Sequence, residues 1–392
     1  MSTEDEFYPI DMGNRSTFAF DLSYLLDAPA GKHGFLSTRE DGHFYFEDGT
    51  RARFWGTNFA HDRAIFGSHE MMDAIAEKLA SVGCNMIRFH FFDWFWDWWG
   101  KSSNDSGEET HAFVSDVEKE ESSDYLAGSI FDESYDDTRH LSEEKLERLD
   151  YTIYALKQRG IYTYMDLLDY RNFTSADGVV ASEGLNWGAK PASIYDSRLI
   201  ELQKEYARSL LTHENAHTGL RYVDDPAICA VELTNENSLF WEQALHLPPY
   251  YVDELRELWN RWLLEQYGDR EGLAEAWTNH QGRGALMVDE DPEEGTVRLP
   301  NVVDAFRLDW AHRSYGDPRE GTVRCNDGAR FYYALQWEYY VEMRDYLRSL
   351  GVKVPISACV TPHVAPDLKA VADELDFISN GTYYDHPNNS VR

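Results

Sequence analysis

The chain has 392 residues, of which 43% are hydrophobic, and this is enough to build the full core of one barrel-sized domain. Its 36 Lys and Arg residues face 70 Asp and Glu residues, and the formal net charge of −34 creates a field that repels nucleic acid and anionic membranes. Because the acidic residues are spread among apolar periodic segments, we expect a folded surface adapted to high salt and not a disordered acidic tail.

The N-terminal segment, Met1 to Glu6, is acidic and lacks the apolar stretch of a secretory signal, which predicts a cytoplasmic protein. The chain has no run of eighteen apolar residues, so the sequence predicts no transmembrane helix. Further on, Asp48-Gly49 separates two alternating segments and predicts an N-terminal β-hairpin over residues 34–57. Its second arm is expected to continue into the first strand of the main sheet.

Beyond the hairpin, helical and strand-like segments alternate with short links. Apolar spacing predicts helices at 71–82, 142–160, 199–211, 252–267, 339–350 and 368–375. Apolar runs predict six strands at 53–58, 84–91, 161–168, 227–234, 352–358 and 376–380. This alternation is typical of parallel strands joined by right-handed crossovers, so we expect an α/β fold of the (β/α)8 barrel type.

Two segments interrupt the alternation. Residues 102–139 are polar and very acidic, which predicts a solvated loop after the second strand. Residues 245–336 contain strong helical patterns and predict a helical insertion after the fourth strand, within a single domain that spans 1–392. The four cysteines are scattered, which favours buried free thiols over a metal cluster or a disulfide framework; they are Cys84, Cys229, Cys325 and Cys359.

The most informative segment is the apolar run 227–233, which ends abruptly in Thr234-Asn235-Glu236-Asn237. In (β/α)8 barrels the chemistry lies at the C-terminal ends of the strands. A carboxylic acid at such an end suits acid/base catalysis, and Asn235 beside it could hold a ligand hydroxyl. The alternative is an ordinary strand end at which Asn235 and Glu236 cap the next helix.

Arg88 and His90 stand near the end of the second strand. Arg88 could pair with a carboxylate in the barrel mouth, or it could form a purely structural salt bridge. His90 could donate a hydrogen bond to a sugar, or it could be a core histidine whose hydrogen bonds are satisfied internally.

The segment 91–100 is unusually rich in aromatic residues. Indole rings pack on the C–H faces of sugars, while carboxylates such as Asp93 and Asp97 accept hydroxyl hydrogens, so the segment predicts a sugar-binding surface. The alternative is a core plug beneath a loop. The candidate stacking residues are Trp94, Trp96, Trp98 and Trp99.

After the sixth strand, Tyr383 and Tyr384 place phenols at a strand mouth, where one could hydrogen-bond a catalytic carboxylate. The alternative is a turn stabilised by Asp385 and Pro387. Known zinc, phosphate-loop and serine-hydrolase signatures are absent from the sequence.

Four motifs, in this order, resemble the clan of retaining glycoside hydrolases with (β/α)8 barrels, which includes cellulases, β-mannanases and β-galactosidases. They are Arg53-Phe54-Trp55-Gly56-Thr57-Asn58, Asn85-Met86-Ile87-Arg88-Phe89-His90, Thr234-Asn235-Glu236, and Asp376-Phe377-Ile378-Ser379 followed by Tyr383. The helical segment 259–277 is similar to the one after strand four in thermophilic-type β-galactosidases.

The resemblance implies hydrolysis of β-glycosidic bonds in oligo- or polysaccharides with retention of configuration, and no metal or cofactor. It implies that Glu236 is the proton donor and Asn235 its sugar-binding neighbour, and that Arg88 and Tyr383 orient the nucleophile. Asn58 in the first motif joins the candidates for substrate binding. The expected partner is therefore a carbohydrate.

In this clan the nucleophile is a second glutamate at the end of a seventh strand, and no seventh-strand pattern precedes Arg392. Retaining hydrolysis needs two carboxylates about 5–5.5 Å apart, so we expect an incomplete barrel that lacks its nucleophile. Asp166 and Asp169, at the mouth of the third strand, are the alternative nucleophiles within the chain.

Two alternative functions remain. The first is a catalytically silent barrel that binds carbohydrate. The second is a metal-dependent barrel hydrolase that would use His61, His90 and Asp93.

Overall fold

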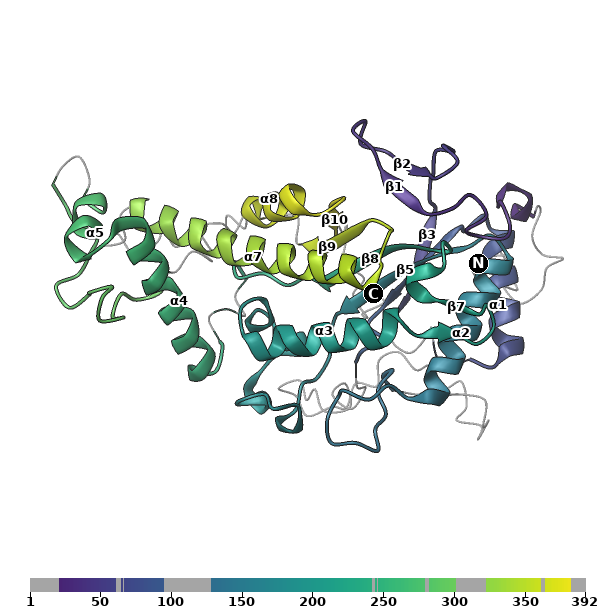
Figure 1. Ribbon diagram of the computed structural model, residues 1–392, viewed down its shortest axis with the longest axis horizontal. Helices are drawn as coiled ribbons and strands as arrows, with labels where there is room; N and C mark the ends of the chain where they lie inside the picture. Colours follow the sequence, from purple (N-terminus) through teal and green to yellow (C-terminus); the bar gives the residue numbers. More distant parts are fainter. Residues whose placement is uncertain are drawn as a thin grey trace, which may run out of the picture.

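The structure is a computed structural model that describes residues 21–60, 65, 67–94, 128–241, 244, 246–278, 282–300, 322–360 and 364–381. Within these residues six parallel strands form a curled sheet, the half-barrel that the sequence predicts (Figure 1). Its order is β10-β9-β8-β5-β4-β3, so neighbours in space are neighbours along the chain. The strands are β3 (Gly56–Ala60), β4 (Met86–His90), β5 (Tyr162–Leu168), β8 (Ile228–Asn235), β9 (Ile356–Val360) and β10 (Ser379–Asn380).

All six predicted strands are confirmed, and the differences lie at their ends. The first strand begins at Gly56 and not at Arg53. The backbone of residues 53–55 is hydrogen-bonded to the Asn85 side chain and not to the backbone of a neighbouring strand in a regular ladder. The Asn85 side chain accepts a hydrogen bond from the Trp55 amide at 2.7 Å and donates one to the Arg53 carbonyl at 2.9 Å.

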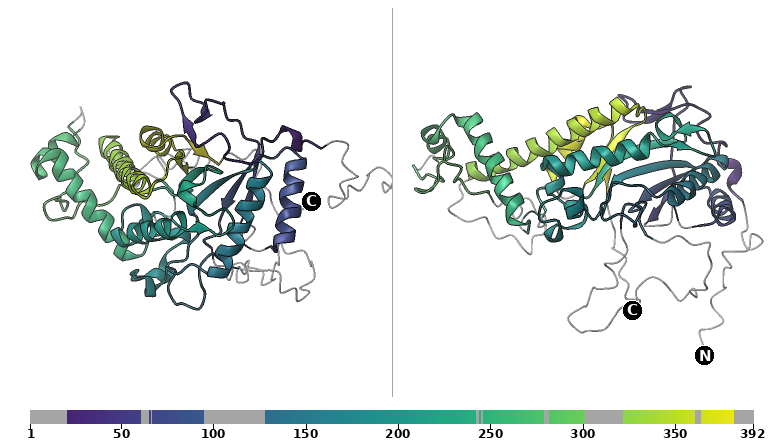
Figure 2. Two further views of the ribbon diagram at one scale, coloured as in Figure 1. Left: turned by 45° about the vertical axis from the view of Figure 1, so that its right-hand side comes forward. Right: turned by 60° about the horizontal axis from the view of Figure 1, so that its bottom comes forward.

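Helices cover the convex face of the sheet. Figure 2 shows α1 (His69–Ser81) beside α2 (Glu143–Gln158), and α3 (Ser197–Leu211) beside α7 (Thr322–Leu350). Outward-facing strand residues such as Phe89 and Met165 pack against these helices in one large core. Because successive strand residues alternate between faces, the charged residues among them point the other way, into the half-barrel. A shorter helix, α8 (Ala365–Glu374), packs on α7 and β9.

Side chains that accept hydrogen bonds fix where three of these helices begin. Ser68, Ser142 and Asp196 each accept a backbone amide from the first turn, which satisfies a donor that has no partner within the helix. The predicted starts of α1, α2 and α3 agree with these caps to within a few residues.

The predicted helix 339–350 is the second half of a longer one, since α7 begins at Thr322 and does not break at 336. Its first half packs against α4 (Pro249–Tyr267) and α5 (Arg270–Ala276), and Figure 1 shows these three segments extending away from the sheet. Buried Arg324 on α7 donates to both carboxylate oxygens of Glu290 at 2.7 and 2.9 Å, which fixes the helix in this arrangement.

The predicted N-terminal hairpin is present in altered form. The turn at Asp48-Gly49 forms, with Gly49 at φ +87°, but the arm after it bridges β2 only at Arg51. Instead β2 (Phe44–Phe46) pairs antiparallel with β1 (Leu36–Thr38) on its other side. The hairpin packs on the concave face of the sheet, in a second apolar cluster of buried residues: Ala30, Leu36, Phe46, Ala52, Tyr162, Tyr164, Ala227, Cys229 and Ala230.

The remaining elements are short. A two-residue ladder joins β6 (Glu214–Asn215) to β7 (Leu220–Arg221), and 3-10 turns lie at 23–25, 175–177, 182–184, 187–189, 192–194 and 222–224. No disulfide joins any of the four cysteines, all of which lie within the described residues, and Cys84, Cys229 and Cys359 are buried, as predicted. In the part of the chain that the structure describes, none of the helices combines the length and hydrophobicity needed to cross a bilayer.

Candidate active site

Inward-facing side chains of three neighbouring strands meet in an ionic cluster inside the half-barrel. Arg88 on β4 donates from Nε to Asp166 Oδ1 at 3.0 Å, and its Nη2 contacts the Glu232 carboxylate on β8. The Tyr164 hydroxyl donates to the second Glu232 oxygen at 2.5 Å. The strand register brings these residues together, because Arg88 lies opposite Tyr164 and Asp166 lies opposite Glu232.

His90 extends this cluster toward the strand ends. Its Nδ1 lies 2.6 Å from Asp166 Oδ2 and 3.4 Å from Asp169 Oδ1. The other Asp169 oxygen accepts the Phe91 amide at 2.8 Å. His90 therefore contacts two buried carboxylates through Nδ1, so this nitrogen is engaged within the protein.

The charges in this region nearly balance. Four buried carboxylates face the three cationic side chains of Arg88, His90 and Lys190; the carboxylates belong to Asp93, Asp166, Asp169 and Glu232. Because burial disfavours charge, one proton retained among the carboxylates would neutralise the set.

The pKa values agree with this balance. Burial and the nearby Glu232 charge raise the pKa of Asp166 to about 8. Burial opposes the positive charge of His90, yet Asp169 and Asp166 together raise the pKa of His90 to about 10. Burial likewise opposes the charge on Arg88, but the Asp166 and Glu232 carboxylates hold its pKa above the ordinary value.

Asp93 shapes the loop that follows β5. Its Oδ2 accepts the backbone amides of Asp169, Tyr170 and Arg171 at 2.8, 3.2 and 3.2 Å, and Oδ1 accepts the Tyr170 amide at 3.1 Å. The side chain is 2% exposed. Burial and the Asp169 charge raise the pKa of Asp93 to about 7, despite the backbone amides that favour its charged form.

The segment Asn235-Glu236 lies at the end of β8, where the acid/base catalyst is predicted. Asn235 is buried, and its Oδ1 accepts a hydrogen bond from Arg88 Nη2 at 3.1 Å. Glu236 is partly exposed, and its amide donates to the Cys359 carbonyl at 2.8 Å. The sequence-predicted pair Arg88 and Asn235 is therefore in direct contact.

Two residues at these strand ends have left-handed backbones. Glu236 has φ +46° after β8, and Phe91 has φ +63° after β4. A side-chain-bearing residue in this region carries a cost on the order of 1–3 kcal/mol, and such residues cluster at functional sites. The backbone thus turns sharply where Glu236 leaves the strand, and the turn sets the direction of its side chain.

Lys190 lies beside the strand ends and was not predicted from the sequence. Its ammonium group is 4.7 Å from the ring centre of Tyr170. Burial lowers the pKa of Lys190, although the charges of Asp169 and Glu236 oppose the shift. Glu236 consequently has a cation in its neighbourhood.

Aromatic side chains connect this region to a groove. Trp94, which is buried, lies 5.4 Å from the Tyr170 ring, and Trp187 lies 5.0 Å from the same ring while remaining 37% exposed. Trp187 borders a groove of about 670 Å³. The other lining residues are Asn172, Phe173, Thr174, Ser175, Ser182, Glu183, Leu185 and Asn186.

The remaining predicted residues divide into two groups. Asn58 is exposed on the edge strand β3, directly opposite Arg88 in register. The others lie outside the described residues, so the structure says nothing of their roles: His61, Trp96, Asp97, Trp98, Trp99, Tyr383, Tyr384 and Asp385.

Sequence reasoning missed Glu232, Tyr164 and Trp187 as well as Lys190. A signal existed for Glu232, because a carboxylate inside a buried apolar run requires a partner. Nothing local marks Tyr164 or Trp187, whose significance depends on neighbours from other elements.

One group in the cluster has metal-ligand chemistry. Ligand atoms of His90, Asp166 and Asp169 lie within 4.8 Å of one another. Asp166 is already bonded to the Arg88 guanidinium, however, and this fixed cation repels a metal ion at the same carboxylate. The donor set suits an ion-pair network better than a cation site.

No protein-family model matches the chain. Over 209 residues, 53% of its length, the chain is 25% identical to the mannan endo-1,4-β-mannosidase F of Aspergillus fumigatus. The match covers 40% of that protein, so the chain spans less than half the length of this curated relative.

Similar solved structures include two β-galactosidases and a mannanase. The enzyme of the haloarchaeon Halorubrum lacusprofundi has a TM-score of 0.48 at 16% identity, over 84% of this chain and 40% of that one. The enzyme of Bacillus circulans sp. alkalophilus has a TM-score of 0.47 at 18% identity, over 86% of this chain and 41% of that one. The endo-1,4-β-mannanase of Rhizomucor miehei has a TM-score of 0.38 at 18% identity, over 60% of this chain and 57% of that one. The sequence match and the half-barrel confirm the resemblance found in the motifs: over about half of its length the chain is homologous to a mannan endo-1,4-β-mannosidase.

Proposed function

We propose that this chain carries the acid/base part of a glycoside hydrolase active site for β-linked glycans, with mannan as the first substrate to test. The observation that carries the proposal is Asn235-Glu236 at the end of β8, with Asn235 fixed by Arg88 and Glu236 partly exposed on a left-handed backbone. The 209-residue match to a mannan endo-1,4-β-mannosidase supports the choice of substrate.

In this proposal Glu236 protonates the glycosidic oxygen as the bond breaks, and afterwards removes a proton from the attacking water. Because Arg88 engages Asn235 Oδ1, the Asn235 side chain acts through its Nδ2 donor, which binds a sugar hydroxyl beside the scissile bond. Arg88 touches no substrate and acts as a positioning residue, together with the buried carboxylates that hold it.

The sugar-binding surface of the proposal is the aromatic group at the groove. The exposed part of Trp187 offers a flat face for the C–H side of a pyranose ring, and Glu183 in the same groove offers a hydroxyl acceptor. Asp93 supports this surface indirectly, because its carboxylate holds the backbone of 169–171. Asn58, Trp96, Trp98, Trp99, Tyr383 and Tyr384 remain predicted contributors.

The second carboxylate of a retaining mechanism is proposed to lie outside the described residues. Asp166 and Asp169 are each 1% exposed, and their oxygens are engaged by Arg88, His90 and the Phe91 amide. Neither is therefore suited to attack a sugar. The resemblance assigns this role to a glutamate after a seventh strand.

The inaccessibility of Asp166 and Asp169 also favours the second candidate, a carbohydrate-binding barrel without catalysis. The two functions differ in one measurable respect. Both require saturable glycan binding, but only the first requires that binding lead to hydrolysis through Glu236.

The test is hydrolysis by wild type and Glu236→Gln of mannan oligosaccharides and of aryl β-mannosides with good and poor leaving groups. General acid catalysis contributes roughly 10²–10⁴-fold, so the variant should lose that factor on poor leaving groups and little on activated ones. Glu257→Gln, an exposed change on α4, is the matched control.

An equal loss on both kinds of leaving group would contradict the acid/base assignment. Binding of oligosaccharide by wild type and Glu236→Gln alike, without turnover by either, would support the silent barrel. Absence of glycan binding by both proteins would overturn both candidate functions.

A further inference from the structure

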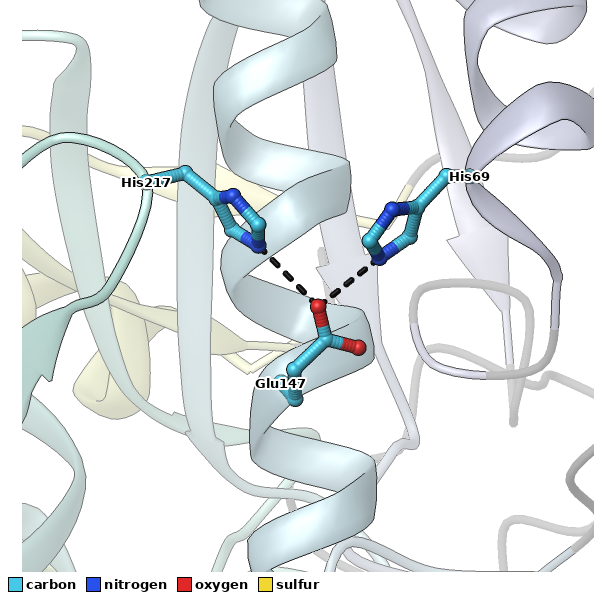
Figure 3. Close-up of side chains that lie close together, drawn as sticks. All are labelled: His69, Glu147 and His217. Carbon is cyan, nitrogen blue, oxygen red and sulfur yellow. Dashed lines mark hydrogen bonds and ion pairs between the residues drawn. The ribbon is translucent and has the colours of Figure 1, made fainter.

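We infer that His69, Glu147 and His217 form a binding site for one divalent transition-metal ion on the outer surface of the half-barrel, apart from the Arg88 cluster. Figure 3 shows the two imidazole rings converging from opposite sides on the same carboxylate oxygen. Two imidazoles and a carboxylate are a donor set that Zn²⁺ and its neighbours in the first transition series accept.

The donor atoms are already close together. His69 Nε2 lies 2.8 Å from Glu147 Oε1, and His217 Nε2 lies 3.0 Å from the same oxygen. All three ligand atoms lie within 4.8 Å of one another. Zinc bonds to nitrogen and oxygen are about 2.0–2.2 Å long, so a small outward movement of Glu147 opens room for the ion between the three atoms.

A tyrosine one helical turn beyond Glu147 holds both rings. The His69 ring stacks on Tyr151 with centroids 3.6 Å apart and planes 4° apart, and the His217 ring meets Tyr151 edge-on at 5.1 Å. The Tyr151 hydroxyl in turn donates to Asp73 at 3.0 Å. The rings are thus oriented by packing and do not depend on the Glu147 contact alone.

The backbones of the two histidines are also attached to α2. Arg148 on α2 donates to the Gly67 carbonyl at 3.0 Å, just before the start of α1 at His69. On the other side, Asn215 donates to the Asp150 carbonyl at 2.9 Å and accepts the His217 amide at 2.8 Å. Two segments far apart in the sequence are therefore fixed to the helix that carries Glu147, which lowers the entropy that metal binding must overcome.

The three ligand side chains are partly exposed to solvent, so a bound ion would lie at the surface of the helical layer. The side chains of His69, Glu147 and His217 are 42%, 43% and 27% exposed, so water can complete the coordination. Such an ion joins α1, α2 and the β6–β7 turn from outside. It stabilises the helical layer, and its binding does not depend on the proposed function of the strand ends.

The experiment is a Zn²⁺ titration of the chelator-treated full chain in molar KCl with excess Mg²⁺, which suppresses unspecific binding to the acidic surface. We expect one ion per chain and a thermal unfolding midpoint that rises with Zn²⁺, because the ion binds only the folded state. His69→Ala and His217→Ala should each weaken binding by at least roughly 10-fold. The exposed residues His43 and Glu144 supply the controls His43→Ala and Glu144→Gln, which should bind as wild type.

A second measurement uses wild type alone, in case a variant fails to fold. Co²⁺ should bind in the same place and give the visible absorption bands of an ion with few ligands. Absence of saturable Zn²⁺ binding by wild type would overturn the inference. So would an undiminished affinity in the folded His69→Ala/His217→Ala double variant.

Discussion

Arg88 links the charges inside the half-barrel, because two buried carboxylates share its guanidinium. Its guanidinium contacts Asp166 and Glu232, whose side chains are 1% and 0% exposed. A buried ion pair adds little net stability by itself, but removing one member leaves a charge without its partner. Arg88 thus adds little stability by itself, but it allows the side chains of Asp166 and Glu232 to be buried.

We therefore expect Arg88→Met to lower the free energy of unfolding by about 3–5 kcal/mol, as measured by urea titration. Arg159→Met is the matched control, because Arg159 is 44% exposed and lies 3.7 Å from Glu77; it should change stability by less than about 1 kcal/mol. A variant at Arg88 as stable as the control would mean that the cluster tolerates the loss by protonation.

The raised pKa of His90 predicts an alkaline loss of stability. The folded-state value is about 10 against an ordinary 6.5, so the folded protein holds a proton that the unfolded chain releases between these pH values. Stability is then fully present below pH 6.5 and is lost as the pH rises toward 10. Asp166, raised from 3.8 to about 8, acts in the same direction over the lower part of this window.

Urea unfolding across this range should show stability falling by up to about 1.4 kcal/mol per pH unit for each proton involved. His90→Gln should flatten the slope between neutral pH and pH 10, whereas exposed His43→Gln should not. An unchanged slope in the His90 variant would place the proton elsewhere in the cluster.

At the scale of single residues, the sequence predicted Arg88, Asn235 and Glu236 because each stands at the end of an apolar run. It did not predict which carboxylates Arg88 contacts. Glu232 and Asp166 meet through the register of β8 against β5, and this pairing includes an irregularity between Thr163 and Tyr164 that no local pattern specifies.

Among the elements, the loop after β5 depends on a carboxylate from another loop. Asp93 accepts three consecutive backbone amides of 169–171, and this contact places Asp169 beside His90 and Tyr170 beside Trp187. Two loops that follow different strands are thereby joined into one wall of the candidate site.

Asp93→Ala should leave these buried amides without acceptors and lower the free energy of unfolding by roughly 1–3 kcal/mol. Hydrogen exchange should show faster exchange at 169–171 than in wild type, while the amides of β5 itself keep their protection. Asp132→Ala is the control, because the Asp132 carboxylate accepts an exposed amide, that of Ser134. Unaltered exchange at 169–171 would contradict the conclusion that Asp93 holds the backbone of these residues.

The sequence predicted elements well where the pattern was local and less well where partners were distant. The strands of the half-barrel and the helices α1, α2 and α3 were found from the periodicity of their apolar residues. The first half of α7 was missed, because its packing on Glu290 and the other helices of 249–276 becomes visible only in three dimensions. The Asp48-Gly49 turn of the hairpin was predicted from the sequence, but the pairing of β2 with β1 was not predicted.

For the whole molecule, the net charge of −34 predicts that salt stabilises the fold. The Debye length falls from about 10 Å at 0.1 M to about 3 Å at 1 M, which removes most of the repulsion between surface carboxylates. The urea midpoint should therefore rise steadily with KCl. Sucrose, which is excluded from protein surfaces without screening charge, is the control and should have a smaller effect. Equal stability in dilute buffer and in molar KCl would contradict a salt-adapted surface.

The position of the N-terminal hairpin has a consequence for the order of events during synthesis. Phe46 packs on Tyr162 at a centroid distance of 5.3 Å, and the same cluster includes Ala230. At ~5–20 residues per second, the ribosome delivers that surface on the order of ten seconds after the hairpin has emerged. During this interval the strand residues that cover Phe46 in the folded protein have not been made, so the apolar face of the nascent hairpin is open to chaperones and to other chains.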